Sequence, residues 1–355
     1  MLILLLALSP AHSAERREFS TGTRSLAMGG VSVATVNDET ALIANPAALG
    51  RLRDFYGTII DPELEVNNHI ATIRKEQAIS SSFSISKISD VALANEGKYL
   101  HSRLQYFPSF VGRNFGIGIL GRSVLDMEAA SATELETFYQ DDLALILGYN
   151  LPLWGGRIKL GFSGKVISRH EVAAVIDPST QALGPSDLAA ADILREGVGV
   201  STDVGILLTA PWTFLPTVGA VLRDVGGTTF DQMTGVRGLH SDERPTAVKQ
   251  DLDVGISISP IHSQLLRSHW SIEYKGVLTA SDEEDKAKLI HFGSEFNVGD
   301  LFFVRFGYHQ RYLTAGLEFA SERLQFQMST HGEEIGTADA PREDRRMTLK
   351  MGVRF

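Results

Sequence analysis

The chain ends on a stretch that alternates between apolar and polar side chains: residues Arg345–Phe355 read RRMTLKMGVRF. Every second position is apolar, namely Met347, Leu349, Met351, Val353 and Phe355. Successive side chains of a β-strand point to opposite faces, so the stretch predicts a strand with one apolar and one polar face. It also has the length of a tilted strand that crosses a bilayer, for which about 9–11 residues suffice.

The terminal aromatic residue adds a second expectation. A closing strand that ends on an aromatic side chain resembles the signal that outer-membrane barrels present to their assembly machinery, here with Met351, Val353 and Phe355 as the signal residues. The end of the chain therefore predicts a strand of an outer-membrane barrel. It also predicts two kinds of partner: the barrel-assembly machinery, and the outer-membrane lipid and lipopolysaccharide around the wall.

The composition narrows the class of protein. The 355 residues carry a net charge of −10 without any basic block, which argues against a nucleic-acid partner. The chain has no cysteine, so disulfides, thiolate metal sites and a cysteine nucleophile are excluded. After the first residues, no apolar run approaches the roughly 20 residues of a membrane-spanning helix.

Residues 1–14 predict a signal peptide. Leu2–Leu8 form a short apolar core, and Ala11, Ser13 and Ala14 supply small residues for cleavage. No basic residue precedes the apolar core, although signal peptides usually carry one there. The alternative is a buried hydrophobic strand. Export from the cytoplasm, toward the outer membrane of a Gram-negative-type cell, is the favoured interpretation.

The next forty residues, 15–54, do not have the pattern of a strand. Gly22, Gly29 and Gly30 interrupt regular structure there. A short helix is predicted over residues 38–48, capped by Asn37 or Asp38 and broken at Pro46, because proline cannot donate a backbone hydrogen bond.

From residue 55 to the end of the chain, alternating runs follow one another and predict an all-β fold. The runs cover residues 55–61, 102–111, 114–125, 138–150, 157–170, 197–210, 216–226, 248–260, 266–276, 288–298, 301–310, 312–320, 322–331 and 345–355. An apolar outer face and a polar inner face are typical of a transmembrane antiparallel β-barrel, here of about 14 strands. A soluble sandwich also alternates, but its strands usually have only about five or six residues.

The connections between the runs alternate between short and long, as periplasmic turns and external loops do. The exception is the tight link at 310–312. The loop 62–101 holds a candidate piece of sheet at 79–86, and the loop 171–196 holds a candidate helix over Ser186–Arg195. About eight strands already suffice for a filled interior, so fourteen enclose more space than side chains alone fill. We therefore expect residues 15–54 to plug the lumen.

Three motifs in the N-terminal segment carry a resemblance to a known family. They are Gly22–Gly30 (GTRSLAMGG), the pair Asn37-Asp38 and the triplet Asn45-Pro46-Ala47. In this order they resemble the hatch of the FadL or OmpP1-type outer-membrane transport proteins, and residues 108–118 resemble two strands of that family around a periplasmic turn. The implied hatch residues are Gly22, Gly29, Gly30, Asp38, Asn45, Pro46 and Ala47.

The resemblance implies passive uptake of hydrophobic or amphipathic compounds such as long-chain fatty acids, with a hydrophobic small molecule as ligand. Relatives with the same motif include PorV-like barrels, which serve protein secretion. The alternative function is therefore a protein-binding or secretion-shuttle barrel without small-molecule transport. The shortened external loops leave both alternatives open.

The alternation of side chains along the predicted strands places five cations on the inner face, where they could hold the head group of a ligand. They are Lys159, Lys165, Arg305, Arg323 and Arg354. The alternative is that they pair with lumen carboxylates such as Asp203, Asp253, Glu273, Glu295 and Glu318. The ten histidines show no metal-ligand spacing, although His291 and His309 both face the predicted lumen. No convincing Ser-His pair is present, so we expect neither an enzyme nor a cofactor or metal.

Overall fold

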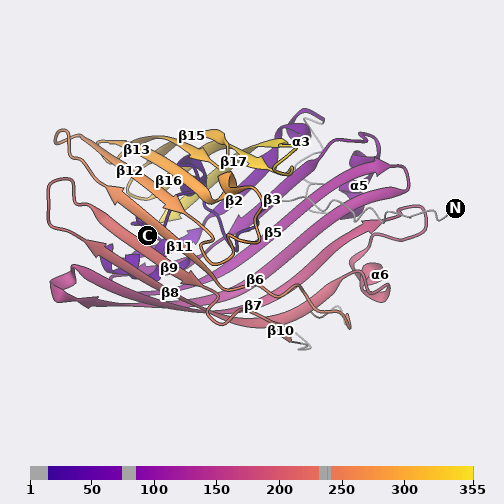
Figure 1. Cartoon of the computed structure of the whole chain (residues 1–355), viewed down its shortest axis with the longest axis horizontal. Coiled ribbons are helices and arrows are strands. Elements are labelled where there is room, and N and C mark those ends of the chain that lie inside the picture. Colours follow the sequence, from indigo (N-terminus) through magenta and orange to yellow (C-terminus); the bar gives the residue numbers. More distant parts are fainter. Residues whose placement is uncertain (1–14, 74–84, 232–237, 239–240, 355) are drawn as a thin grey trace.

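The strands of the barrel form one antiparallel sheet that closes on itself, because β17 pairs with both β1 and β2 (Figure 1). The computed structural model describes the chain apart from residues 1–14, 74–84, 232–237, 239–240 and 355. The predicted signal peptide, the terminal Phe355 and most of the candidate sheet at 79–86 thus lie outside the described residues.

The sheet contains seventeen segments in the described chain. In chain order they are β1 (Tyr56–Ile60), β2 (Pro62–Asn67), β3 (Leu100–Tyr106), β4 (Ser109–Gly112), β5 (Phe115–Ser131), β6 (Glu134–Leu153), β7 (Ile158–Ile176), β8 (Arg195–Thr209), β9 (Thr217–Arg223), β10 (Phe230–Asp231), β11 (Asp251–Ile258), β12 (Leu266–Tyr274), β13 (Ile290–Val298), β14 (Phe302–His309), β15 (Tyr312–Ala320), β16 (Leu324–Glu334) and β17 (Glu343–Arg354).

Three of the wall strands consist of two segments each, so the seventeen segments make fourteen strands. The pairs are β1 with β2, β3 with β4, and β9 with β10, and each pair runs along the same neighbouring strand. The first strand shifts register against β17 between Thr58 and Ile60. The second is interrupted at Pro108, which has no N–H to donate. The predicted fourteen-stranded barrel is confirmed.

The prediction was wrong at several places in the long connections. Residues 126–137 were expected to form a loop, but β5 and β6 continue into a tight hairpin there. Both faces of this extension are partly covered, and the alternation that marks a strand in the bilayer fades. Residues 62–67 form β2 instead of a loop. Ile85, expected in a strand, begins a helix.

The helices are short and lie in the N-terminal segment and in the loops. They are α1 (Thr23–Ala27), α2 (Ala41–Ala44), η1 (Pro46–Arg51), α3 (Asn68–Ile73), α5 (Ile85–Leu93), η2 (Trp154–Gly156), α6 (Pro185–Ala190) and η3 (Lys286–Leu289). None of the helices in the described parts of the chain is long and apolar enough to cross a membrane.

The outer surface of the wall is apolar. Along β6, Leu145, Leu147 and Tyr149 are 44–53% exposed, while Ile146 between them is fully buried. The closing strand repeats the pattern, with Met351 53% exposed. Exposed apolar bands around a closed barrel are the mark of outer-membrane proteins, whose wall faces lipid. The protein is an outer-membrane barrel, and the end with the short turns faces the periplasm.

Candidate functional site

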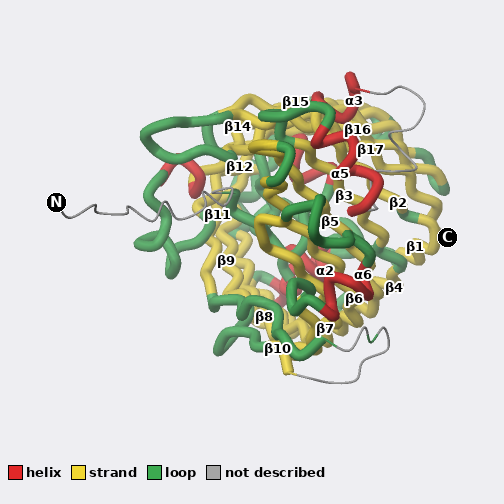
Figure 2. Tube along the Cα trace, turned by 90° about the vertical axis from the view of Figure 1, so that its right-hand side faces the viewer, coloured by secondary structure: helices red, strands yellow, loops and turns green. Residues whose placement is uncertain are grey.

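The N-terminal segment lies inside the ring of strands (Figure 2), where its backbone packs closely on glycines of the wall. Gly29 has φ +68°, and a Cβ there would stand 2.2 Å from the carbonyl oxygen of Phe292. On the facing wall, a Cβ on Gly307 would stand 2.3 Å from the Gly29 nitrogen. The glycine-rich motif therefore serves close approach of two backbones, as well as the left-handed conformation that glycine adopts readily.

The Asn45-Pro46 turn is seated against the opposite side of the wall. The Asn45 side chain donates to the Val33 carbonyl at 2.8 Å and accepts from the Ala47 N–H at 3.0 Å. Pro46 opens η1, so the helix predicted over 38–48 divides there into α2 and η1. A Cβ on the wall residue Gly161 would stand 2.0 Å from the Ala47 nitrogen.

Ion pairs tie the same segment to the wall. Arg24 bonds Asp38 at 2.8 Å within the segment and Glu295 of β13 at 3.0 Å. Glu39 bonds Lys350 and Arg354 of β17 at 3.3 and 2.9 Å. Burial alone would raise the pKa of Asp38, but Arg24 and the hydrogen bonds from Thr40 hold that pKa well below its ordinary value.

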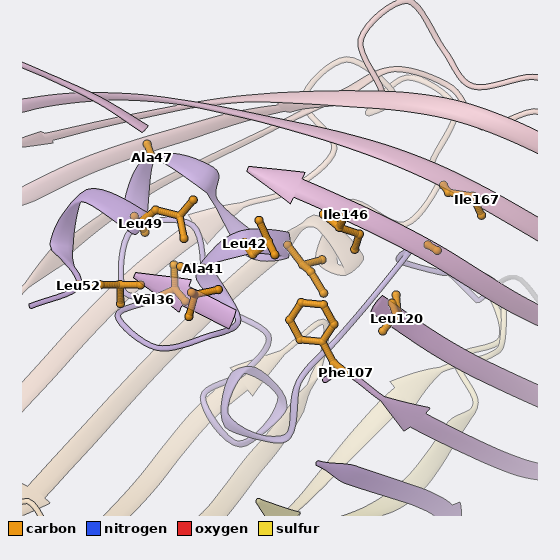
Figure 3. Close-up of a cluster of buried hydrophobic side chains, with 14 of the residues drawn as sticks. Val36, Ala41, Leu42, Ala47, Leu49, Leu52, Phe107, Leu120, Ile146 and Ile167 are labelled. Carbon is orange, nitrogen blue, oxygen red and sulfur yellow. The ribbon is translucent and has the colours of Figure 1, made fainter. Parts of the chain in front are cut away.

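An apolar cluster joins the segment to one sector of the inner wall (Figure 3). We call it the inner cluster. Its buried members are Val36, Ala41, Leu42, Ile43, Ala47, Ala48, Leu49, Leu52, Phe107, Val111, Leu120, Ala144, Ile146, Ile167, Leu207 and Phe230. The wall residues among them come mainly from β4 to β8, so the lumen is apolar on that side. Phe107 stands beside the Pro108 interruption of the second strand.

A second apolar cluster, the outer cluster, fills the external mouth. Its buried members are Ile70, Ile85, Ile88, Ala92, Leu100, Leu125, Met127, Ala129, Leu135, Val172, Ile176, Leu188, Ala189 and Leu194. The loop helices α5 and α6 cover it, and the end view of Figure 2 shows both helices at the mouth. Ile85, Ile88 and Ala92 occupy one helical face, a spacing that could have predicted α5 from the sequence.

A small cavity of about 40 Å³ opens beside the outer cluster. It is lined by Tyr99, Met127, Phe138, Ala174 and Val175 together with Arg17. The Arg17 guanidinium lies 3.5 Å from the centre of the Phe138 ring and bonds Asp126 at 2.9 Å. Arg17 thus combines a cation–π contact with an ion pair at the edge of this cavity.

Arg17 belongs to a strap, residues 15–19, that is bonded to several sides of the barrel. Glu15 pairs with Arg346 at 2.8 Å, Arg16 with Asp251 at 2.7 Å, and Glu18 with Lys275 at 2.8 Å. These partners lie on β17, on β11 and just after β12. Because Arg17 binds β5, the strap spans the lumen.

A polar collar separates the two apolar clusters on β6 and β7. Arg169 donates two hydrogen bonds to Asp142, at 2.7 and 2.8 Å, and Gln140 donates a third at 2.7 Å. On β7 the collar residue Arg169 stands between Ile167 of the inner cluster and Val172 of the outer cluster.

Comparison with solved structures identifies the fold. No protein-family model and no curated protein matches the sequence. The CymD monoaromatic hydrocarbon channel matches with a TM-score of 0.58 at 12% identity, over 94% of this chain and 97% of that one. The Pseudomonas putida toluene transporter TodX matches with a TM-score of 0.54 at 11% identity, over 98% and 99%. The chain has the fold of these hydrocarbon channels.

A Pseudomonas aeruginosa FadL homologue also matches, with a TM-score of 0.49 at 9% identity, over 94% of this chain and 98% of that one. The fold does not by itself say what the barrel carries.

The five cations nominated by parity are not gathered at one ligand site. Lys165 pairs with Asp203 at 2.8 Å, and Arg305 pairs with Glu295 at 2.7 Å and with Glu318. Arg354 bonds Glu39. These three follow the alternative interpretation, in which lumen charges pair with one another. Of the other carboxylates, Asp253 bonds Arg223 at 2.6 Å, and Glu273 accepts the N–H groups of Ser32 and Ala34.

The remaining two cations differ from this pattern. Arg323 lies exposed in the periplasmic turn before β16, not in the lumen, because the strand begins two residues later than predicted. The Lys159 ammonium donates to the Gly156 carbonyl at 2.6 Å and has no carboxylate partner among the described residues.

His291 and His309 do meet in the lumen, with their Nδ1 atoms 3.1 Å apart and both directed at the Gly29 carbonyl oxygen. Their role there is to contact the N-terminal segment. Within the described residues, no group of three or more histidine, aspartate or glutamate side chains is placed to hold a metal ion.

Proposed function

We propose that the barrel takes up hydrophobic or amphipathic compounds passively, long-chain fatty acids among them, and that residues 15–54 act as its hatch. The observation that carries the proposal is the pairing of two apolar clusters on the same wall strands, one at the external mouth and one at the N-terminal segment. Channels of the same fold carry monoaromatic hydrocarbons, as the names of CymD and TodX state.

In the proposed path, a ligand first enters the outer cluster beneath α5 and α6. Burial there is favourable by about 0.8 kcal/mol for each methylene group, before the costs of association. The cavity beside Arg17 holds only about 40 Å³, so a ligand must displace side chains or the strap to go further.

Beyond the strap, the ligand meets the inner cluster. Phe107 of that cluster adjoins the interruption of the second wall strand, and the first strand shifts register close by. We propose the wall beside Phe107 as the exit, because interrupted pairing is the place where a barrel wall opens most easily. A shift of the hatch is the alternative exit.

Uptake by cells tests the proposal. Cells without a channel of their own for such compounds would express the full chain and receive a fluorescent twelve-carbon carboxylate. Leu188→Asp places a charge in the outer cluster, whereas Ala190→Asp places the same charge on the exposed face of α6. We expect the first variant to lose most of the uptake and the second to keep it.

Equal surface levels of both variants are the control. Uptake by the wild-type chain no greater than by cells without it would overturn the proposal and favour the protein-binding alternative. Equal uptake by Leu188→Asp and Ala190→Asp would remove the outer cluster from the path.

A further inference from the structure

The periplasmic end of the lumen contains a cavity of about 520 Å³. We call it the vestibule. It lies between the N-terminal segment and the turns that join β8 to β9 and β11 to β12. Its volume falls within the range of about 300–1,000 Å³ that small-molecule sites occupy. The paths described above do not use it.

The charges around the vestibule are nearly all positive. The charged or titratable side chains that line it are Arg51, Arg53, Asp54, Tyr56, Lys159, Arg267 and His269. Asp54 is the one carboxylate among these lining residues, and it is exposed. Arg267 already pairs with Asp300 at 2.9 Å. His269 bonds the Ser259 hydroxyl at 2.9 Å.

Two of the cations are held in place without any counter-charge. The Arg51 guanidinium donates to the Ala34 carbonyl at 2.7 Å, and Lys159 donates to the Gly156 carbonyl. No carboxylate of the described residues pairs with either of them. The aliphatic stem of Lys159 packs on the backbone at Gly50, where an added Cβ would stand 2.9 Å from the Cδ of Lys159. Because Gly50 directly precedes Arg51, the two cations are neighbours.

This arrangement differs from that of most lumen cations among the described residues. The net charge of the chain is −10, and lumen cations such as Lys165, Arg305 and Lys350 all have carboxylate partners. Cations withdrawn from bulk water are costly unless an anion compensates them. The missing counter-charge at the vestibule therefore points to an anion that comes from outside the chain.

The rim of the vestibule is apolar, which indicates more than a simple anion. Leu215 and Ile261 line it and are 47% and 69% exposed. Leu215 has φ +47°, a conformation that a bulky side chain rarely adopts. Its N–H donates to the Trp212 carbonyl at 3.0 Å, and this bond helps to fix the turn. The turn thus presents an apolar side chain to the same cavity as the cations.

We propose that the vestibule binds an anionic amphipath, with Arg51 and Lys159 holding its head group and Leu215 and Ile261 contacting its alkyl chain. A carboxylate or phosphate head has the required charge. The site deepens the proposed function and rests on it, because it names an organic anion as the cargo that reaches the periplasmic side. It also separates this barrel from a channel that carries only neutral hydrocarbons.

Binding to the full chain in lipid nanodiscs tests the site without any transport. The probe is dansyl-labelled undecanoate, its methyl ester is the neutral counterpart, and empty nanodiscs supply the background. We expect the carboxylate to bind about tenfold tighter than the ester, or better, since hydrogen bonds to charged groups are the strong ones. Acetate, which lacks the chain, should compete only weakly.

The double variant Arg51→Gln, Lys159→Gln should bind the carboxylate no more tightly than the ester. Arg157→Gln is the matched control, because it removes a cation two residues from Lys159 that is exposed and does not line the vestibule. Retained folding is checked by heat-modifiable migration in gels. Should the double variant not fold, Ser259→Asp keeps both cations, adds a carboxylate at the rim, and should weaken binding similarly.

A dodecanoate with a terminal diazirine locates the bound chain. Cross-links to residues 209–217 and 257–269 are expected. Equal affinity of the double variant and the wild type, equal affinity for carboxylate and ester, or cross-links confined to the outer cluster would each overturn the site. If cells take up nothing but the purified protein still binds the probe, the proposed uptake function is wrong and the vestibule site remains, because binding does not require transport.

Discussion

Gly161 and Gly164 stand three residues apart on β7 and provide a matched test of how the N-terminal segment is held. Gly161 faces the segment, and an added Cβ would stand 2.0 Å from the Ala47 nitrogen and 2.1 Å from the Pro46 carbonyl carbon. Gly164 faces lipid, and an added Cβ there would meet nothing within 4 Å. Gly161→Ala and Gly164→Ala thus make the same chemical change on the two faces of one strand.

The expected effect of Gly161→Ala follows from these distances. Ordinary contacts of a Cβ begin at 3.4 Å, so Ala47 must retreat by about 1.4 Å, the difference between 3.4 and 2.0 Å. Backbone atoms cannot turn aside as a flexible side chain does. Overpacking of this kind costs about 1–3 kcal/mol, which corresponds to a roughly 5- to 150-fold shift in the equilibrium between docked and undocked segment.

Conductance in planar bilayers measures that shift. We expect Gly161→Ala channels to open more often than wild-type channels, and liposomes that contain this variant to swell faster in small sugars. Gly164→Ala should behave as the wild type in both assays. Both variants must show the heat-modifiable gel migration of a folded barrel. Wild-type permeability in a folded Gly161→Ala barrel would refute the reasoning that contact between Ala47 and the wall seals the lumen.

Two further predictions concern the same segment. Deleting residues 15–48 should raise the permeability of liposomes to small solutes, because the segment fills the lumen; unchanged permeability would show that the wall and loops close the barrel without it. The pKa of Asp38 in the folded protein lies below the value of about 3.9 expected in an unfolded chain. The ionised carboxylate therefore stabilises the docked segment fully above about pH 3.9, and this stabilisation is lost as the pH falls through the lower pKa of the folded protein. Conductance should therefore stay constant from pH 8 to about pH 5 and rise only in stronger acid, and in Asp38→Asn it should be raised at every pH; a rise already between pH 8 and pH 6 would contradict the assignment.

The wall could be predicted from the sequence because lipid imposes one requirement on every strand. Each side chain that faces the bilayer must be apolar, so parity alone places Met347 and Leu349 on the outer face. Parity says nothing about partners in the lumen. Lys165 and Arg305 were correctly placed inside, but their ion pairs with β8, β13 and β15 depend on the register between strands, which one sequence does not specify.

The outer cluster escaped prediction for a different reason. It forms where β5 to β7 extend past the bilayer and are covered by α5 and α6, so the two faces no longer meet lipid and water separately. Met127 of β5 and its neighbour Asp126 point to opposite faces of the strand, and both are buried there. Burial on both faces removes the period of two on which strand prediction depends.

The position of the collar sets a condition that any path for hydrophobic cargo must meet. Asp142 and Arg169 form an ion pair with two hydrogen bonds. Separating them inside the lumen would leave both charges without compensation. The strap is held by more pairs than the collar, since each residue from Glu15 to Glu18 bonds an oppositely charged side chain of the wall. Moving residues 15–19 aside would break four ion pairs, whereas opening the collar breaks one. Cargo that passes from the outer to the inner cluster must therefore displace paired charges at either place, and the collar is the barrier with fewer pairs to break.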